Sequence, residues 1–146
     1  RACQYLNTVM IRLFLIDDNE KVRRQLAMRL QRLADLQVVG EAGSGEEAVR
    51  QALEMQPHVV LVETKTANGR GIETCQRIHQ MAPHIPILVL TSYVDEEERT
   101  RAFSAGAQAY LLKDLDFGAL LQALRQAVPS AAGCNGDAFI KKVSSG

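Results

Sequence analysis

The sequence has no tryptophan, only 5% aromatic residues and three cysteines, and each shortage narrows the class of protein. Cys3, Cys75 and Cys134 are odd in number, lie far apart and form no Cys-x-x-Cys pair, which argues against a disulfide framework and a zinc site. The apolar runs are too short to span a membrane, and Arg1 to Thr8 lacks the apolar core of a signal peptide. We therefore expect a cytoplasmic protein with free thiols and no membrane partner.

Net charge is also missing, because 17 basic and 17 acidic side chains cancel. This balance gives no reason to expect nucleic-acid binding by the chain itself. The 47% of apolar residues and the length of 146 residues suit one globular domain with its own core. We expect this domain at residues 10–128, after an extension at 1–9 and before a linker or disordered tail at 129–146 that is too short for a DNA-binding domain.

Short apolar strands alternate with amphipathic helices along the chain. Leu26 and Leu30 belong to one helical stripe, the spacing of Ser44 and Glu47 predicts a capping box, and Gly106 is placed to end a helix in a left-handed conformation. The strands are predicted at residues 11–16, 36–42, 58–63, 87–92 and 107–112. Strict alternation of this kind predicts an α/β fold, with a parallel sheet covered by helices on both faces.

Polar side chains stand at the ends of four of these strands. They are Asp17 and Asp18 after the first, Glu63 at the end of the third, Thr91 at the end of the fourth and Lys113 after the fifth. The carboxyl ends of parallel strands meet at one edge of a sheet, so these groups should lie together. Close carboxylates repel one another, which favours a raised carboxylate pKa, a bound cation such as Mg²⁺, or a lysine counter-ion. Together these groups are the parts of a phosphoryl-transfer site.

Each of these residues also has an ordinary structural interpretation. An aspartate pair after a strand often caps the next helix, which is the default for Asp18 or Asn19 alone. A threonine at a strand end is usually a turn residue, and a strand tyrosine such as Tyr110 is usually half-buried packing. The functional interpretation depends on the convergence of acid, hydroxyl and ammonium groups from four strands on one edge.

Four motifs together resemble the response-regulator receiver domains of bacterial two-component signalling. They are LIDDNE, VVLVE followed by Gly71, VLTSY and SAGAQAYLLKD, and the last two are most similar to receivers of LuxR-type helix-turn-helix regulators. The resemblance, from Ile11 to about Val128, implies a CheY-like, flavodoxin-like (βα)5 fold with a doubly wound five-stranded parallel sheet in the order 2-1-3-4-5. It also implies a non-enzymatic regulatory part of a transcription regulator, which would reach DNA only through an output domain absent from this chain.

The resemblance assigns roles to individual residues. Position 63 is where the family accepts phosphate from a sensor histidine kinase, and Tyr110 matches the aromatic residue whose rotamer reports the active state. The implied Mg²⁺ ligands are Asp17, Asp18, Glu63 and the backbone carbonyl of Lys65. The implied phosphoryl-binding residues are Thr91 and Lys113. The resemblance also leaves open a homodimer.

Glu63 departs from the family, whose acceptor is Asp. One extra methylene moves the carboxylate by about 1.5 Å, and a misplacement of about 1 Å can cost a rate factor of roughly 10². We therefore expect weak or no phosphorylation and weakened Mg²⁺ binding. The partnership with a sensor histidine kinase would be weakened or lost. In one alternative, Glu63 reaches Thr91 and Lys113 and imitates the phosphorylated state in part. In the other, Glu63 pairs with Lys113 alone and leaves the domain inactive or independent of phosphate. We favour the first alternative, without expecting full activation.

Two other functions fit parts of the sequence. GSGEEA supplies Gly43, Gly45 and Ala48 of a G-x-G-x-x-A pattern, with Glu63 placed 20 residues after the first glycine, as in a Rossmann-type dinucleotide-binding protein. This motif follows the second strand, however, and leaves the other strand ends unexplained. A phosphatase with an aspartyl nucleophile needs a second Asp two residues after the first, which IDDNE does not supply.

Overall fold

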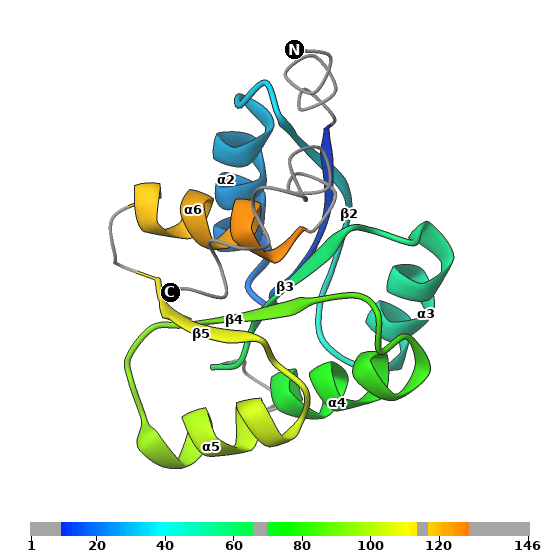
Figure 1. Cartoon of the computed structure of the whole chain (residues 1–146), viewed down its shortest axis with the longest axis vertical. Coiled ribbons are helices and arrows are strands. Elements are labelled where there is room, and N and C mark those ends of the chain that lie inside the picture. The colour runs from blue at the N-terminus through cyan, green and yellow to red at the C-terminus, as the bar shows by residue number, and fades with distance from the viewer. Residues whose placement is uncertain (1–9, 66–69, 114–116, 129–146) are drawn as a thin grey trace, which may run out of the picture.

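The computed structural model describes residues 10–65, 70–113 and 117–128, in which strands and helices alternate (Figure 1). The elements are β1 (Ile11–Ile16), α2 (Glu20–Gln31), β2 (Leu36–Ala42), α3 (Glu46–Met55), β3 (Val59–Glu63), α4 (Gly71–Met81), β4 (Ile87–Thr91), α5 (Glu96–Ser104), β5 (Ala109–Leu112) and α6 (Phe117–Ala127). The extension and tail predicted at residues 1–9 and 129–146 lie outside the described residues.

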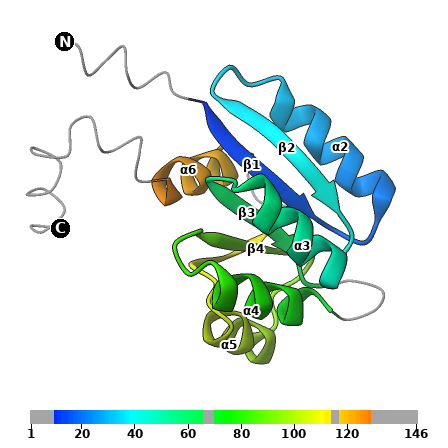
Figure 2. The same ribbon diagram turned by 90° about the vertical axis from the view of Figure 1, so that its right-hand side faces the viewer.

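The five strands form one parallel sheet in the order β2-β1-β3-β4-β5, as the resemblance implied. Helices α2 and α6 cover one face, and α3, α4 and α5 follow one another along the other (Figures 1 and 2). The strand order reverses between β1 and β3, and in sheets of this kind binding sites lie at the carboxyl ends of the strands at such a point. Asp17 follows β1 and Glu63 ends β3, which places both at this end of the sheet.

Strand β3 lies in the middle of the sheet and has no polar face. Val59 and Leu61 pack against α2 and α6, whereas Val60 and Val62 belong to the core under α3, α4 and α5. Burying side chains of this size stabilises the fold by roughly 1.5–3 kcal/mol each. The apolar strand therefore holds Glu63 rigidly at its carboxyl end.

The capping box predicted from Ser44 and Glu47 is wrong. Helix α3 begins at Glu46, and its N-cap is Gly45, which has a φ of 119° and makes no side-chain capping hydrogen bond. The hydroxyl of Ser44 donates instead to the carboxylate of Asp18. In a capping box the hydroxyl oxygen of serine accepts a hydrogen bond from a backbone amide at the helix start. Because Gly45 is the N-cap, Ser44 lies one residue before the position at which it could do so.

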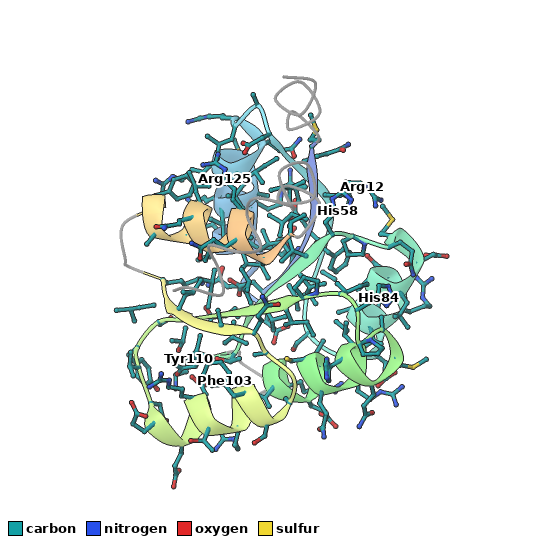
Figure 3. The ribbon with its side chains drawn as sticks, viewed as in Figure 1. Arg12, His58, His84, Phe103, Tyr110 and Arg125 are labelled. Atoms are coloured by element: carbon teal, nitrogen blue, oxygen red, sulfur yellow. The ribbon has the colours of Figure 1, made fainter. Side chains whose placement is uncertain are left out.

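The other predicted helix ends are confirmed. The side chain of Asn19 accepts a hydrogen bond from the amide of Val22 at the start of α2, and Gly106, with a φ of 109°, follows α5. At the amino end of the sheet, the guanidinium of Arg12 donates to the last carbonyls of the α3 segment, and its amide donates to His58 Nδ1 (Figure 3). Arg12 therefore satisfies backbone oxygens that the helix itself leaves unpaired.

Gly71 begins α4 directly beside the end of β3. A Cβ atom at this position would lie 2.6 Å from the carbonyl oxygen of Glu63 and 2.7 Å from Cα of Thr64. These are backbone atoms, which cannot move aside as a flexible side chain can. The absence of a side chain thus lets α4 approach the end of β3.

We expect Gly71→Ala to lower the free energy of unfolding by roughly 1–3 kcal/mol, because the added methyl group overpacks this contact. Urea denaturation measures the change. The control is Gly118→Ala, at an exposed position in the first turn of α6, where the added methyl group should not lower stability. An unchanged stability of Gly71→Ala would contradict the close approach.

Candidate functional site

The ammonium group of Lys113 lies between two carboxylates at the carboxyl edge of the sheet. Its Nζ atom is 3.0 Å from Oδ2 of Asp17 and 3.0 Å from Oε1 of Glu63. Asp17 is 4% exposed and Glu63 is 3% exposed. Buried charges are stable only when they are paired, so both acids depend on this one cation.

Strand pairing explains why a lysine can make this contact. The amide of Lys113 donates to the carbonyl of Thr91, which places Lys113 beside β4 and two strands away from Glu63. Neighbouring strands are about 4.8 Å apart, so the side chains must span roughly 10 Å of backbone separation. The four-carbon stem of lysine spans this distance, and the extra methylene of Glu63 shortens the gap.

Glu63 is held at both of its oxygens. Oε2 accepts a hydrogen bond of 2.7 Å from the backbone amide of Lys65. Oε1 makes an ionic contact with Lys113 whose geometry is not that of a well-directed hydrogen bond. Burial raises the pKa of Glu63, and Lys113 and the Lys65 amide offset this only in part. Glu63 therefore holds a proton more readily than a free glutamate does.

Lys113 responds to the same neighbours in the opposite sense. Burial by itself lowers the pKa of Lys113, but the contacts with Glu63 and Asp17 outweigh it, so the pKa is raised. The lysine stays protonated at neutral pH. The ammonium group of Lys113 is therefore shared by two acids. One of them, Glu63, keeps its proton to a higher pH than a free glutamate does.

Asp18 points away from this group. Its Oδ1 atom accepts a hydrogen bond of 2.6 Å from the amide of Ser44, and the Ser44 hydroxyl lies 2.9 Å from Oδ2. In the part of the chain that the structure describes, no cluster of three or more His, Cys, Asp or Glu side chains is arranged to hold a metal ion. The oxygen donors are of the kind that Mg²⁺ prefers. To hold this ion, Asp17 would have to leave Lys113 and Asp18 would have to leave Ser44.

Thr91 and Tyr110 face a carboxylate that the sequence analysis missed. Thr91 is fully buried, and its hydroxyl lies 2.9 Å from the carbonyl oxygen of Tyr93 and 3.2 Å from Oε1 of Glu98. Tyr110 extends from β5 toward α5 (Figure 3), where its hydroxyl donates to the same Oε1 atom at 2.6 Å. Burial, followed by the contact with Glu98, raises the pKa of Tyr110, which keeps the phenol protonated as a donor.

Glu98 was overlooked because it lies in a run of acids at the start of a helix, where acids are favourable to the helix dipole. One signal could have found it. Glu98 precedes Ala102 by four residues and Ala105 by seven, which is the spacing of an inward-facing stripe, and both alanines are buried. The pattern therefore marks Glu98, unlike its neighbours Glu96 and Glu97, as a side chain that points into the protein.

Comparison with known proteins decides the family. The sequence profile of the response regulator receiver domain matches residues 13–125. The chain belongs to this family. The receiver is 40% identical over 118 residues to the transcriptional regulatory protein LiaR of Bacillus subtilis, covering 81% of this chain and 56% of that protein. It is 38% identical over 116 residues to the DNA-binding transcriptional activator DevR/DosR of Mycobacterium tuberculosis, covering 80% and 54%.

Solved receiver structures have the same fold. A LuxR-family two-component response regulator from Aurantimonas sp. SI85-9A1 matches with a TM-score of 0.75 and 28% identity, over 90% of this chain and 99% of that one. The response regulator domain of Thermotoga maritima CheB matches with a TM-score of 0.72 and 28% identity, over 81% and 96%. The flavodoxin-like fold and the likeness to LuxR-type receivers are thus confirmed. The chain spans about half the length of the two curated relatives above.

The dinucleotide alternative is not favoured. The predicted glycine loop is occupied by the protein itself, because a Cβ atom on Gly43 would lie 2.8 Å from Oδ1 of Asp18. Ser44 in the same loop is bound to this carboxylate.

Within the described residues, no helix of the receiver is long and apolar enough to cross a membrane.

Of the predicted site residues, the receiver brings Asp17, Glu63 and Lys113 into direct contact. Thr91 and Tyr110 lie beside them but are bonded to Glu98. The site therefore has two halves, one centred on Lys113 and the other on Glu98.

We expect Lys113→Met to raise the pKa of Glu63 further, because the burial remains while the lowering contact with the cation is lost. Carbon-13 NMR of the Glu63 carboxyl group, assigned with Glu63→Gln, measures this pKa. Arg125→Met is the control, because it removes a cation that is paired with Asp35 elsewhere on the surface. A pKa that falls or stays constant in Lys113→Met would contradict the ion pair.

The same shift has a consequence for stability. An acid with a raised pKa in the folded state binds its proton more tightly when the protein is folded. Its contribution to the free energy of unfolding therefore falls as the pH rises from the ordinary pKa of 4.5 through the pKa of the folded state. Glu63→Gln should flatten the pH dependence of the unfolding free energy in this window. An unchanged slope would contradict the raised pKa.

Proposed function

We propose that this receiver is the regulatory part of a LuxR-type DNA-binding transcription regulator in a cytoplasmic two-component system, with Glu63 at the acceptor position. The curated relatives above are regulators of transcription, and one is called DNA-binding. They are nearly twice as long as the matched region, which supports an output domain in the remainder of such a protein. DNA binding would belong to that domain, and the partner that signals to the receiver would be a sensor histidine kinase.

The observation that carries the proposal is the ion pair between Glu63 and Lys113. Lys113 is the residue proposed to bind a phosphoryl group, and the Glu63 carboxylate already lies 3.0 Å from its Nζ atom. Glu63 therefore supplies one contact that a phosphoryl group would make. Its single charge is smaller than the roughly −1.5 to −2 of a phosphate group, so the imitation of the phosphorylated state is partial.

An imitation of the phosphorylated state should also include a contact with Thr91, but the contacts of Thr91 are different. The hydroxyl of Thr91 is directed to the carbonyl of Tyr93 and to Glu98, not to the acceptor position. The favoured alternative, in which Glu63 reaches both Thr91 and Lys113, therefore does not match these contacts, which are those of the alternative in which Glu63 pairs with Lys113 and not with Thr91. The rotamer of Tyr110, turned toward α5, is then set by contacts other than those of residue 63.

Glu63 is also a poor phosphate acceptor for geometric reasons. It is 3% exposed, and its two oxygens contact Lys113 and the Lys65 amide. A shorter aspartate would withdraw the carboxylate by up to about 1.5 Å and open space beside the ammonium. Mg²⁺ binding by Asp17, Asp18 and the Lys65 carbonyl would require Asp18 to leave Ser44, so we propose that it is weak.

We expect Glu63→Asp to restore labelling by acetyl phosphate in the presence of Mg²⁺, at a rate roughly 10² above that of the unsubstituted receiver, because the carboxylate moves to the family's position. Phosphate-affinity electrophoresis measures the labelled fraction. The matched control is Glu73→Asp, which makes the same substitution at an exposed position on α4 and should not be labelled. Absence of labelling in Glu63→Asp would contradict the proposal that the extra methylene of Glu63 is what limits phosphorylation.

A further inference from the structure

Glu98 is a charged side chain at a position where helices usually carry an apolar one. It is 4% exposed, whereas Glu96 and Glu97 in the same turn of α5 are exposed. Ala102 and Ala105, which follow it at four and seven residues, are buried in the core under this face of the sheet. Burying a carboxylate is costly unless it is paired and hydrogen-bonded, so its partners show what it does.

The partners of Glu98 lie on, or directly after, three different strands. Oε1 accepts hydrogen bonds from Tyr110 at 2.6 Å and from Thr91 at 3.2 Å, and Oε2 lies 3.3 Å from Nζ of Lys65. Tyr110 belongs to β5, Thr91 ends β4, and Lys65 follows β3. One side chain of α5 therefore connects all three strands on the acceptor side of the sheet.

Lys65 links Glu98 to the acceptor residue itself. Its side chain is only 17% exposed and approaches Glu98, Oδ2 of Asp95 at 3.6 Å and the ring of Tyr93 at 4.0 Å from the centroid. Its backbone amide donates to Glu63. The segment after β3 is thus fastened to the connection between β4 and α5 by an ammonium group that is neutralised by the buried carboxylate.

The hydroxyl groups of Thr91 and Tyr110 both form hydrogen bonds on the α5 side of the site. Each hydroxyl has a single proton to donate. The proton of Thr91 is shared between the Tyr93 carbonyl and Glu98. The hydroxyl of Tyr110 is much closer to Glu98, at 2.6 Å, than to its other acceptor, the Asp95 carbonyl at 3.5 Å. A group on residue 63 would have to compete with a charged, buried acceptor for either of them.

We propose that Glu98 is a positioning residue for Thr91 and Tyr110, whose orientation it sets independently of the group carried by residue 63. In this arrangement Glu98, on the α5 side, accepts hydrogen bonds from these two hydroxyl groups. A phosphoryl group on residue 63, on the β3 side, would otherwise attract the same hydroxyl groups. The inference rests on the proposed function in one respect, namely that Thr91 and Tyr110 are the residues that such a group would act on. The face formed by α5 and β5 then keeps one conformation whether or not residue 63 is charged.

Tyrosine NMR tests the inference without any phosphorylation. The sequence has three tyrosines, so labelling with carbon-13 at Cζ gives few signals, and Tyr110→Phe identifies that of Tyr110. We expect Glu98→Ala to move the Tyr110 signal and Glu63→Gln to leave it in place. Glu97→Ala, which removes an exposed acid from the same helical turn, is the control and should also leave it in place. The inference is overturned if Glu98→Ala has no effect or if Glu63→Gln moves the signal equally far.

A second variant separates charge from packing. Glu98→Gln keeps the size of the side chain and an oxygen acceptor but loses the charge that faces Lys65, so it should move the Tyr110 signal in the same direction by a smaller amount. This variant also replaces Glu98→Ala if the alanine protein does not fold. An unmoved Tyr110 signal in folded Glu98→Gln would then overturn the inference.

The reactivity of the Glu63→Asp receiver gives an independent readout. Combining Glu63→Asp with Glu98→Ala should raise the rate of labelling by acetyl phosphate about fivefold, the factor expected from freeing one ordinary hydrogen-bond donor. Equal rates in the single and double variants would overturn the role assigned to Glu98 at Thr91. If neither variant is labelled, the proposed function fails, while the Tyr110 spectrum still decides the inference.

Discussion

Pairing of buried charge at the carboxyl edge of the sheet is the constraint on which the rest of the site depends. Asp17, Glu63 and Glu98 are all at least 95% buried, and an unpaired carboxylate in such surroundings would be strongly destabilising. Two ammonium groups are paired with them: Lys113 contacts the first two acids and Lys65 contacts the third. Because each cation comes from a different strand end, charge pairing also fixes how the ends of the sheet are arranged.

The two halves of the site are joined through Lys65. Its amide holds one oxygen of Glu63, and its side chain reaches the carboxylate of Glu98. A displacement of the segment after β3 would therefore disturb both halves at once. The topology makes this possible, since β3 and β4 are neighbours in the sheet and α5 follows β4 directly along the chain.

The sequence predicted the parts of this structure that depend on periodicity and topology. Alternating apolar segments gave the parallel sheet, and the rule that strand ends meet at one edge placed Asp17, Glu63 and Lys113 together. It did not predict the partner that each polar group chooses. The hydroxyl of Ser44 was expected to accept a hydrogen bond at the start of the helix, but the N-cap is Gly45, and the hydroxyl donates instead to Asp18 after another strand.

Glu98 was missed for a related reason. A run of acids at a helix start has a sufficient local explanation in the helix dipole, and only the positions of the buried alanines further along the helix show which acid points inward. Its partners lie seven or more residues away along the chain, on elements whose approach is a result of the fold. Local patterns therefore located the strand ends but could not reveal the hydrogen-bond network between them.

The extra methylene of Glu63 and the carboxylate of Glu98 act on the site in the same sense. The longer side chain brings the Glu63 carboxylate within 3.0 Å of Lys113, and Glu98 engages the hydroxyl of Thr91. Both groups proposed to bind a phosphoryl group are thus already occupied by carboxylates of this chain. Shortening residue 63 would release only the ammonium group, because Thr91 would still be bonded to α5. In the proposed function, an output face that follows phosphorylation would therefore require both carboxylates to leave these groups.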